Sequence, residues 1–514
     1  MRRDIVLSIN VKNTMYSSIQ IYVEYFIGFA ISVLIARSLG PEDFGNYGFF
    51  VKLCGVAMIL TNSGINTGVV KFIAEARNAS DDVAKINFIA SYLQRLQLIK
   101  TIVFSGLMVT ALALFPKLFI KVEDVWLALL LLVGSIFFKS GYMYRINVLR
   151  GSERFDLMAF TVLIVCPINL VAALLAYYLQ LGLDSYIYLF FAISFLYWLA
   201  AGLFIPKIWR KEASFDADYS DIKERINHHV KLMSISAIIG GIGVGQVEVL
   251  LLQPLVGSEA VSYFTIAATI AGAVMLLVPG VYSSILLPVI ARTLFVSKKN
   301  TAKKIQNSMR HLFILSMLVG IPNMLYARDI VVILYGQEYV QAAWILSVLV
   351  LAKSFGICLE PLSAYLLSAD KQVFLLKISI TFFIVTWSLS YFAISEFGLK
   401  GAVAAAIAIL IIKILVITVT TKKSIELRLN LFGYLRVLFA AGISGMISFI
   451  AVDDHVGILR IILGFGTFSI SYVFLLLTLG TLSHSEYKAI KHNCQKLGRL
   501  PCMIISLLIR PYIK

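Results

Sequence analysis

Eleven ionisable side chains fall inside long apolar stretches of this chain, where any chemistry would occur away from bulk water. Eight of them remain once Lys377, Arg436 and Arg460, within about a turn of an end, are left out. They are five lysines and three glutamates: Glu24, Lys52, Lys100, Lys139, Glu248, Lys353, Glu360 and Lys413. On insertion scales, one charge at the centre of a bilayer costs about 2.5–3.5 kcal/mol, so charges at that depth face a cavity or one another. The excess of lysines predicts a positively charged lining that attracts an anionic group such as a diphosphate.

The candidate substrate-binding residues are these five lysines and an arginine at the end of the first apolar stretch: Lys52, Lys139, Lys353, Lys100, Lys413 and Arg37. An ammonium group attracts phosphate oxygens without demanding one geometry. For Lys100, Lys139 and Lys413, which lie nearer the ends of their stretches, snorkelling to the membrane surface is the alternative. For Lys52 and Lys353, the alternative is an ion pair between packed helices.

The three glutamates, Glu24, Glu248 and Glu360, are candidate ion-coupling residues. A carboxylate in a water-accessible chamber inside a membrane is suited to taking up and releasing protons. The alternative is a static ion pair with a lysine of the same chamber. Lys353 and Glu360 are seven residues apart, which places them on one face of a continuous helix, two turns apart.

The elements that must position these groups are membrane helices. Hydrophobic residues make up 60% of the 514 residues and charged residues 14%, against roughly 45–50% and about 25% in soluble proteins. The apolar residues form long runs, so we predict an all-α polytopic membrane protein. The five cysteines are widely separated and predict neither a disulfide framework nor a metal site.

A window of about 19 residues predicts fourteen membrane-spanning segments. Their predicted limits are 15–36, 46–65, 97–115, 125–144, 158–179, 185–205, 232–254, 261–289, 311–327, 341–364, 373–395, 401–420, 432–451 and 459–480. The third and ninth segments follow polar amphipathic stretches, which we expect to extend those two helices into the cytoplasm.

Lysine and arginine placement predicts the orientation of the chain. Alternate connections, starting with the N-terminus, hold 32 of these residues, and the other connections hold 5. Basic residues accumulate on the cytoplasmic side of membrane proteins, so we expect both termini to be cytoplasmic. The net charge of +17 then faces the cytoplasmic membrane surface and indicates no nucleic-acid partner.

The connection after the sixth segment stands where a linker between two halves would lie. We predict a six-helix lobe at 1–211, a cytoplasmic linker at 212–231, a second six-helix lobe at 232–425, two extra helices at 426–480 and a basic tail at 481–514. The tail contains an apolar run, Leu500–Ile509, that is too short to cross a bilayer. We interpret it as an interfacial segment on the inner leaflet; a disordered tail is the alternative.

The chain also repeats itself. Gly-x-Glu occurs at 40–42 and again at 257–259, and similar strings occur at 149–154 and 366–371. Both pairs have the same offset of 217 residues and occupy equivalent loops. Two matches at one spacing predict a duplication of six-span halves. Because six is even, the halves enter the membrane in the same direction and enclose a cavity between them.

The stretch 34–45, Leu-Ile-Ala-Arg-Ser-Leu-Gly-Pro-Glu-Asp-Phe-Gly, resembles the end of the first helix and the first loop of polysaccharide-unit flippases. The string at 149–154 is similar to the fourth loop of the same family. These flippases, among them the O-antigen and capsule-unit translocases, belong to the multidrug/oligosaccharidyl-lipid/polysaccharide (MOP) exporter superfamily. The predicted span number and linker position agree with this resemblance over essentially the whole chain.

The resemblance implies a flippase of lipopolysaccharide or capsule biosynthesis. Its substrate would be an undecaprenyl-diphosphate-linked oligosaccharide, moved by alternating access from the inner to the outer leaflet of the bacterial inner membrane. Protons or sodium ions would be the coupling ions, and a polysaccharide polymerase and chain-length proteins would be partners. The resemblance implies no cofactor.

Two other kinds of function compete with this interpretation. A small-molecule antiporter of the same superfamily would have twelve spans and a more acidic cavity for cationic drugs. A membrane enzyme, such as a polysaccharide polymerase, would normally have a large domain with paired carboxylates, and no loop here has room for one. The six histidines lack ligand spacing, and no catalytic triad can be assembled from the loops, so we expect neither an enzyme nor a metal site.

Overall fold

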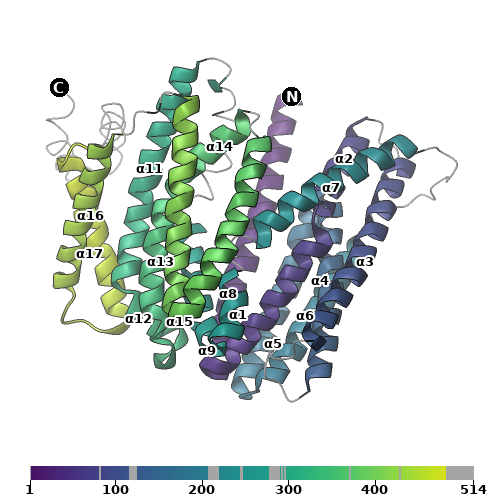
Figure 1. Cartoon of the computed structure of the whole chain (residues 1–514), viewed down its shortest axis with the longest axis horizontal. Coiled ribbons are helices and arrows are strands. Elements are labelled where there is room, and N and C mark those ends of the chain that lie inside the picture. Colours follow the sequence, from purple (N-terminus) through teal and green to yellow (C-terminus); the bar gives the residue numbers. More distant parts are fainter. Residues whose placement is uncertain are drawn as a thin grey trace. The chain divides into compact units, whose positions relative to one another are not determined.

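The protein folds as a bundle of long helices, seen here in a computed structural model that describes residues 2–79, 83–114, 124–205, 219–242, 247–276, 290, 293–294, 297–369, 372–425, 427 and 430–481. No strand occurs among these residues (Figure 1). The predicted all-α polytopic fold is therefore confirmed. The tail beyond Thr481 and residues 212–218 of the predicted linker lie outside the described part of the chain.

The first group of helices runs from the N-terminus to the predicted linker: α1 (Arg2–Asn62), α2 (Ile65–Ala79), α3 (Val83–Leu114), α4 (Val125–Gly151), α5 (Phe155–Tyr178) and α6 (Leu183–Phe204). The second group is α7 (Ser220–Ile242), α8 (Val247–Leu255), α9 (Ser258–Leu276), α11 (Lys298–Leu325) and α12 (Ala327–Tyr335). The third group is α13 (Ala342–Gly356), α14 (Glu360–Ser368), α15 (Gln372–Ser424), α16 (Leu431–Ala451) and α17 (Gly457–Thr478). The short 3-10 helices η3 (Gln337–Tyr339) and η4 (Ile357–Leu359) flank α13.

Eleven helices of the described chain are long and apolar enough to cross a membrane, and the bent pair α7 and α8 makes a twelfth. Two of the eleven cover 48 and 47 residues, Met15–Asn62 and Leu376–Lys422, about twice the length that one crossing needs. Gly40 and Gly398 interrupt these two helices with non-helical backbone. Each long helix thus supplies two spans, and all fourteen predicted spans coincide with helices wherever their residues are described.

Two details differ from the predicted boundaries. The connections at 37–45 and 396–400 are helical apart from their kinks, because one non-helical glycine is enough to turn the chain. In addition, α3 begins at Val83 and α11 at Lys298, well before the spans they contain. This confirms that the amphipathic stretches ahead of the third and ninth spans extend those helices.

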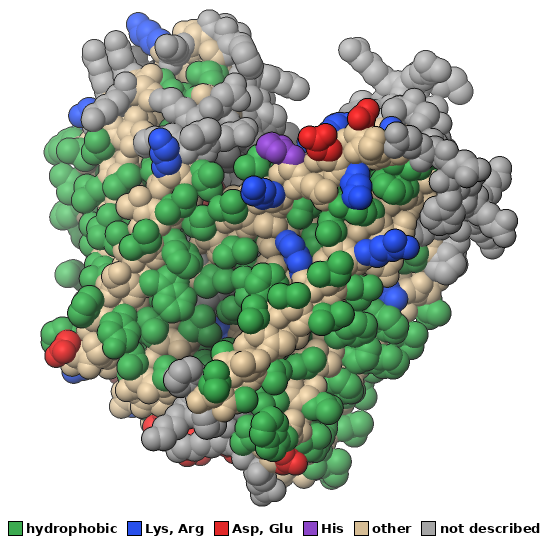
Figure 2. Space-filling view, turned by 45° about the vertical axis from the view of Figure 1, so that its right-hand side comes forward, with side chains coloured by type: hydrophobic (Ala, Val, Ile, Leu, Met, Phe, Trp, Pro, Cys, Tyr) green, Lys and Arg blue, Asp and Glu red, His purple; other side chains and the backbone are tan. Residues whose placement is uncertain are grey.

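The chain divides into two compact units. Unit 1 comprises Met1–Thr265 and Leu376–Ala406, and unit 2 comprises Ile266–Leu375 and Ile407–Lys514. The predicted lobes and linker remain a prediction. On the face drawn in Figure 2, hydrophobic side chains cover most of the surface and charged side chains are few, as expected for helices that contact lipid.

One end of unit 1 is built around α2. The apolar side of α2 packs on α3, α4 and α7 through buried residues that include Ile65, Val69, Ile73, Leu93 and Val230. At this end α2 lies beside α7 (Figure 1). Residues 219–231 of the predicted linker are therefore largely an ordered part of α7 that is docked on the first helices of the chain.

In unit 2, α16 and α17 form a hairpin that packs on α11 (Figure 1). Its core contains Phe313 and Met317 of α11, Val437 of α16, and Phe468 and Tyr472 of α17. The two predicted extra helices are thus attached to the rest of unit 2 by an apolar interface.

Candidate functional site

Lys139 of α4 lies at the centre of the main charged cluster in unit 1. Its side chain is half-buried, and its Nζ lies 4.1 Å from the centre of the Phe190 ring of α6. Glu24 and Cys54, from the two arms of α1, are close enough to interact electrostatically with this ammonium group. The aromatic ring and the carboxylate both favour a positive charge at this place.

Lys52 and Glu248 form a second charged pair in unit 1. Lys52 is on the second arm of α1 and Glu248 is in the first turn of α8. The two side chains interact electrostatically, and Glu248 is only 6% exposed. The structure thus brings together two residues that were predicted separately, one for substrate binding and one for ion coupling.

Lys100 of α3 occupies a third polar site, where its ammonium group donates hydrogen bonds to backbone and serine oxygens. Its Nζ donates to the carbonyl oxygen and the Oγ of Ser63, at 2.9 and 3.3 Å, and to the Oγ of Ser234, at 2.9 Å. Ser234 of α7 also donates to the Ser63 carbonyl, at 2.7 Å. A cation suits the C-terminus of α1, which leaves backbone carbonyls without helical partners. The contacts give Lys100 a role in joining α1, α3 and α7.

In unit 2 the predicted residues are spread out. Lys353 of α13 is half-buried and donates to the carbonyl oxygen of Ala268 of α9, at 3.3 Å. Glu360 is exposed at the start of α14, and Lys413 is exposed on α15. The 3-10 turn η4 interrupts the α-helix between Lys353 and Glu360, so the continuous helix on which their shared face was predicted is absent. Their joint role stays a prediction.

The remaining predicted side chains lie at the surface of unit 1. Glu24 is exposed despite its contact with Lys139, and Arg37 is exposed near the kink of α1. Two members of the Lys139 cluster, Cys54 and Phe190, were not predicted. Their position beside Lys139 could not be predicted from the sequence, because nothing marks an uncharged residue in an apolar stretch as the neighbour of a particular charge before the helices pack.

The two Gly-x-Glu loops meet inside unit 1. Ser258 donates to the Oδ1 of Asn46 at 2.8 Å, and the side-chain amide of Gln253 donates to both residues at 3.2 Å. A Cβ added at Gly45 would collide with the Ser258 carbonyl oxygen, so glycine is needed for this close approach. Gly40 and Gly257, equivalent in the two motifs, both have positive φ, 73° and 120°. These similarities support the duplication, which stays a prediction.

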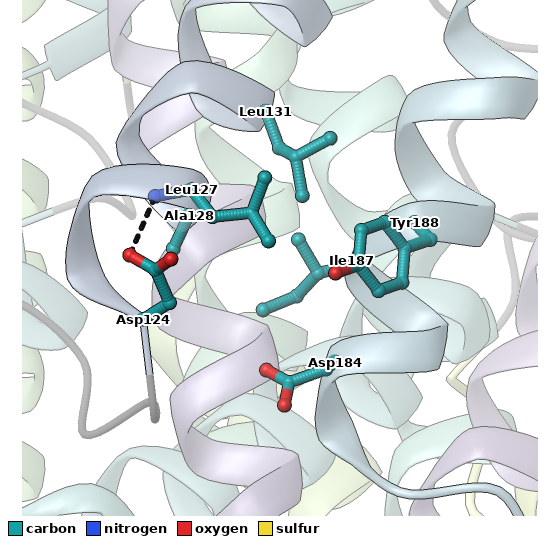
Figure 3. Close-up of a pocket in the computed structure, with 7 residues that line it drawn as sticks. All are labelled: Asp124, Leu127, Ala128, Leu131, Asp184, Ile187 and Tyr188. Carbon is teal, nitrogen blue, oxygen red and sulfur yellow. Dashed lines mark hydrogen bonds between the residues drawn. The ribbon is translucent and has the colours of Figure 1, made fainter.

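A small pocket lies between the first turns of α4 and α6, and no residue of it was predicted. Its volume is 130 Å³, and its lining is Asp124, Leu127, Ala128, Leu131, Asp184, Ile187 and Tyr188 (Figure 3). Asp124 caps α4 by accepting a hydrogen bond from the backbone N–H of Leu127, at 3.0 Å (Figure 3). Binding pockets for small molecules typically measure about 300–1,000 Å³, so this pocket is too small for an oligosaccharide.

Among the described residues, no group of three or more His, Cys, Asp and Glu side chains is arranged to hold a metal ion. The predicted charged groups that the structure brings together are the pairs Lys139 with Glu24 and Lys52 with Glu248. Such pairs are suited to binding an ionic group and to exchanging partners with it.

Residues 10–294 match the family described as "Polysaccharide biosynthesis protein". The chain belongs to this family. The match spans more than half of the sequence and confirms the resemblance carried by the loop motifs at 34–45 and 149–154. Among curated proteins, none matches the sequence.

Solved structures share the fold of this family member. The lipid II flippase MurJ, in an inward closed conformation, superposes with a TM-score of 0.72 at 14% identity, covering 91% of this chain and 99% of its own. An inward-facing multidrug resistance MATE family transporter of the MOP superfamily gives 0.64 at 16% identity, covering 80% and 98%. The Vibrio cholerae MATE transporter VcmN gives 0.55 at 15% identity, covering 83% and 99%. The polysaccharide biosynthesis protein thus has the fold of MOP-superfamily transporters.

Proposed function

We propose that this protein is a flippase that moves a polyprenyl-diphosphate-linked oligosaccharide repeat unit across the bacterial inner membrane. The unit passes from the inner to the outer leaflet by alternating access, and undecaprenyl is the lipid carrier. Family membership and the fold shared with a lipid II flippase support the substrate class. The observation that carries the proposal is the pair of lysines, Lys139 and Lys52, held beside carboxylates in unit 1.

The lysines bind the diphosphate by exchanging partners. In the absence of substrate, Glu24 and Glu248 offset the positive charge of Lys139 and Lys52. A diphosphate that enters offers each ammonium group new oxygens, and charge-assisted hydrogen bonds of this kind are stronger than neutral ones. The other predicted binding residues, Lys353, Lys100, Lys413 and Arg37, remain part of the proposal as secondary contacts along the route.

Release of the diphosphate needs the reverse exchange, which the carboxylates supply. Glu24 and Glu248 gain or lose a proton as the diphosphate arrives and leaves, and this couples transport to the proton gradient; Glu360 is the third candidate. The test is transport in proteoliposomes with Glu24→Gln and Glu248→Gln. We expect at least one variant to lose its dependence on an imposed pH gradient. If both keep the wild-type dependence, proton coupling through these groups is wrong.

The proposed orientation has both termini in the cytoplasm, and the basic connections contact the inner leaflet. A polysaccharide polymerase and chain-length proteins would receive the flipped unit on the outer side. These proteins act on the product and are not needed for the flipping step itself.

A cation antiporter is the second candidate function, because MATE transporters share the fold. The sign of the charged groups favours the flippase: inside the predicted spans, and leaving out Lys377, Arg436 and Arg460 near the span ends, five lysines stand against three glutamates. A cavity for cationic drugs would be expected to have the opposite balance.

The proposed function is tested by deleting the gene and measuring lipid-linked repeat units in a strain with no redundant carrier. We expect intact units to accumulate on the inner leaflet and surface polysaccharide to disappear, with both reversed by the wild-type gene. Normal surface polysaccharide in the deletion strain contradicts the proposal. Unchanged lipid-linked units combined with a new sensitivity to cationic drugs would favour the antiporter.

A further inference from the structure

The first arm of α1 carries different side chains on opposite faces. Tyr22 and Phe26 are 39% and 59% exposed, and their rings stack with centres 6.4 Å apart. Glu24 lies two residues from each, which on an α-helix is roughly 200° around the axis. An apolar aromatic face suits lipid, whereas a carboxylate at this depth does not. The face with Glu24, which interacts electrostatically with Lys139, is therefore the polar face of this arm.

Gly28 lies on the same face as Glu24. It follows Glu24 by four residues, which is about one helical turn along and roughly 40° around the axis. A Cβ added at Gly28 would have no heavy atom within 4 Å, apart from its own helix. The backbone of α1 next to the Glu24 carboxylate is thus not covered by any other side chain of the described residues.

Helix packing does not explain this glycine. At Gly134 and Gly141 of α4, an added Cβ would collide with Phe191 and Trp198 respectively, so those glycines make room for neighbouring helices. Gly28 has no such neighbour, and its φ angle is not positive. Glycine in a helix interior costs about 1 kcal/mol relative to alanine, and neither packing nor backbone conformation accounts for that cost here.

The second arm of α1 has the same arrangement. Gly55 follows Lys52 by three residues, again about one turn along the helix. No heavy atom lies within 4 Å of a Cβ built at Gly55, and its φ is not positive. The two intramembrane charges of α1 are therefore each followed, one turn later, by a glycine that borders open space.

We propose that Gly28 and Gly55 determine the size of the headgroup that can pass along α1, by keeping the space beside Glu24 and Lys52 clear for the oligosaccharide. This inference rests on the proposed function. The charges attract the diphosphate, and the bare backbone one turn away leaves room for the sugars attached to it. Side chains at these two positions would narrow the route without disturbing the packing of the unit.

A size series at Gly28 tests this proposal through transport: Gly28→Ala, Gly28→Leu and Gly28→Trp in the full-length protein, with a matched series at Gly55. We expect alanine to have little effect, leucine to slow transport by about tenfold and tryptophan to slow it further, as expected when bulk is added where a ligand must fit. The thermal unfolding temperature should stay within a few degrees of the wild-type value throughout. The matched control is Gly106→Trp on α3, an exposed glycine that also borders open space and has no charged residue one turn away; it should transport normally.

Normal transport by a folded Gly28→Trp variant overturns the proposal for that position, and equal losses for Gly106→Trp overturn it for both. A second measurement does not depend on the substrate: Gly28→Cys should react with a membrane-impermeant charged thiol reagent above the wild-type background. Absence of labelling would place Gly28 against lipid and contradict the inference. If the gene deletion shows that the proposed function is wrong, the labelling still decides whether Gly28 borders an aqueous route.

Discussion

In unit 1, Lys139 and Lys52 interact electrostatically with carboxylates, whereas the predicted site residues of unit 2 lie on separate helices, Lys353 on α13, Glu360 on α14 and Lys413 on α15. Lys100 of unit 1 donates to serine and backbone oxygens, Lys353 of unit 2 donates to a backbone carbonyl, and Lys413 is exposed. A buried charge is strongly destabilising without a partner, so the buried Glu248 and Lys52 stabilise each other, and under the proposed function the diphosphate would replace one partner. Under the proposed function, this difference favours unit 1 as the place where the diphosphate binds.

Both units join helices through apolar cores, and they differ in the polar contacts that accompany those cores. In unit 1, polar contacts join the helix ends: Lys100 donates several hydrogen bonds, and the side-chain oxygen of Asn46 accepts one from Ser258. Unit 2 attaches the α16 and α17 hairpin by an apolar core, to which a Tyr326–Ser448 hydrogen bond at 2.6 Å, a Tyr472–Ile314 hydrogen bond at 3.2 Å and an Arg460–Asp329 ion pair at 3.5 Å are added. Polar contacts can be exchanged during transport, whereas an apolar core is better suited to a fixed attachment.

The largest expected effect comes from Lys139→Gln. The variant lacks the ammonium group that is proposed to bind the diphosphate, and a hydrogen bond to a charged group contributes about 1.5–3 kcal/mol, so transport in proteoliposomes should fall by about tenfold to a hundredfold. Lys413→Gln is the matched change in unit 2 and should alter transport by less than about threefold, as expected for an exposed charge. Equal losses in both variants would remove the distinction between the units.

A double-mutant cycle on Lys52 and Glu248 measures the second pair. Lys52→Gln and Glu248→Gln should each lower the unfolding temperature, and the double variant should recover part of the loss because no unpaired charge remains. The expected coupling is about 1–3 kcal/mol in the free energy of unfolding. Strict additivity would show that the two residues do not interact. A cycle on Lys353 and Glu360 in unit 2 is the comparison and should be additive.

Lys100→Met separates a structural role from substrate binding. The variant loses three hydrogen bonds to Ser63 and Ser234 but keeps the apolar stem, and a hydrogen bond to a charged group contributes about 1.5–3 kcal/mol. We expect a lower unfolding temperature, with transport per folded molecule reduced less than about threefold. A large loss of transport at unchanged stability would instead support the predicted binding role of Lys100.

The smallest expected effect is that of Tyr326→Phe in unit 2. It removes one neutral hydrogen bond, to Ser448, and leaves the ring in place, so the free energy of unfolding should fall by about 1 kcal/mol. Transport should be unchanged. A marked transport defect would show that the hairpin takes part in the transport cycle and is more than a fixed attachment.

The sequence was sufficient for the spans, because about 20 consecutive apolar residues can only be a membrane helix. It was also sufficient to place Glu24, Lys52, Lys139 and Glu248 inside the membrane, since charge in an apolar stretch is visible without any structure. It could not pair them. Glu24 and Lys139 are 115 residues apart in the sequence, and only the packing of α1 on α4 brings them together.

Local geometry was the other feature that could not be predicted from the sequence. The interruption of the α-helix at η4, between Lys353 and Glu360, cannot be predicted from residue spacing. The hydrogen bonds from Lys100 to Ser63, at the end of α1, cannot be predicted in this way either. The close approach of Gly45 to Ser258 joins two motifs that the sequence related only by their offset. Each of these features depends on which helices meet, and apolar periodicity does not specify that.

The central claim is that the paired lysines of unit 1 bind the diphosphate. It is tested most directly by native mass spectrometry of the purified protein with undecaprenyl diphosphate, comparing the wild type, Lys139→Gln and Lys413→Gln. We predict that Lys413→Gln retains the lipid like the wild type, that Lys139→Gln binds it at least about tenfold more weakly, and that inorganic diphosphate displaces it from the wild type. Equal binding by all three proteins, with no displacement by diphosphate, would contradict the account.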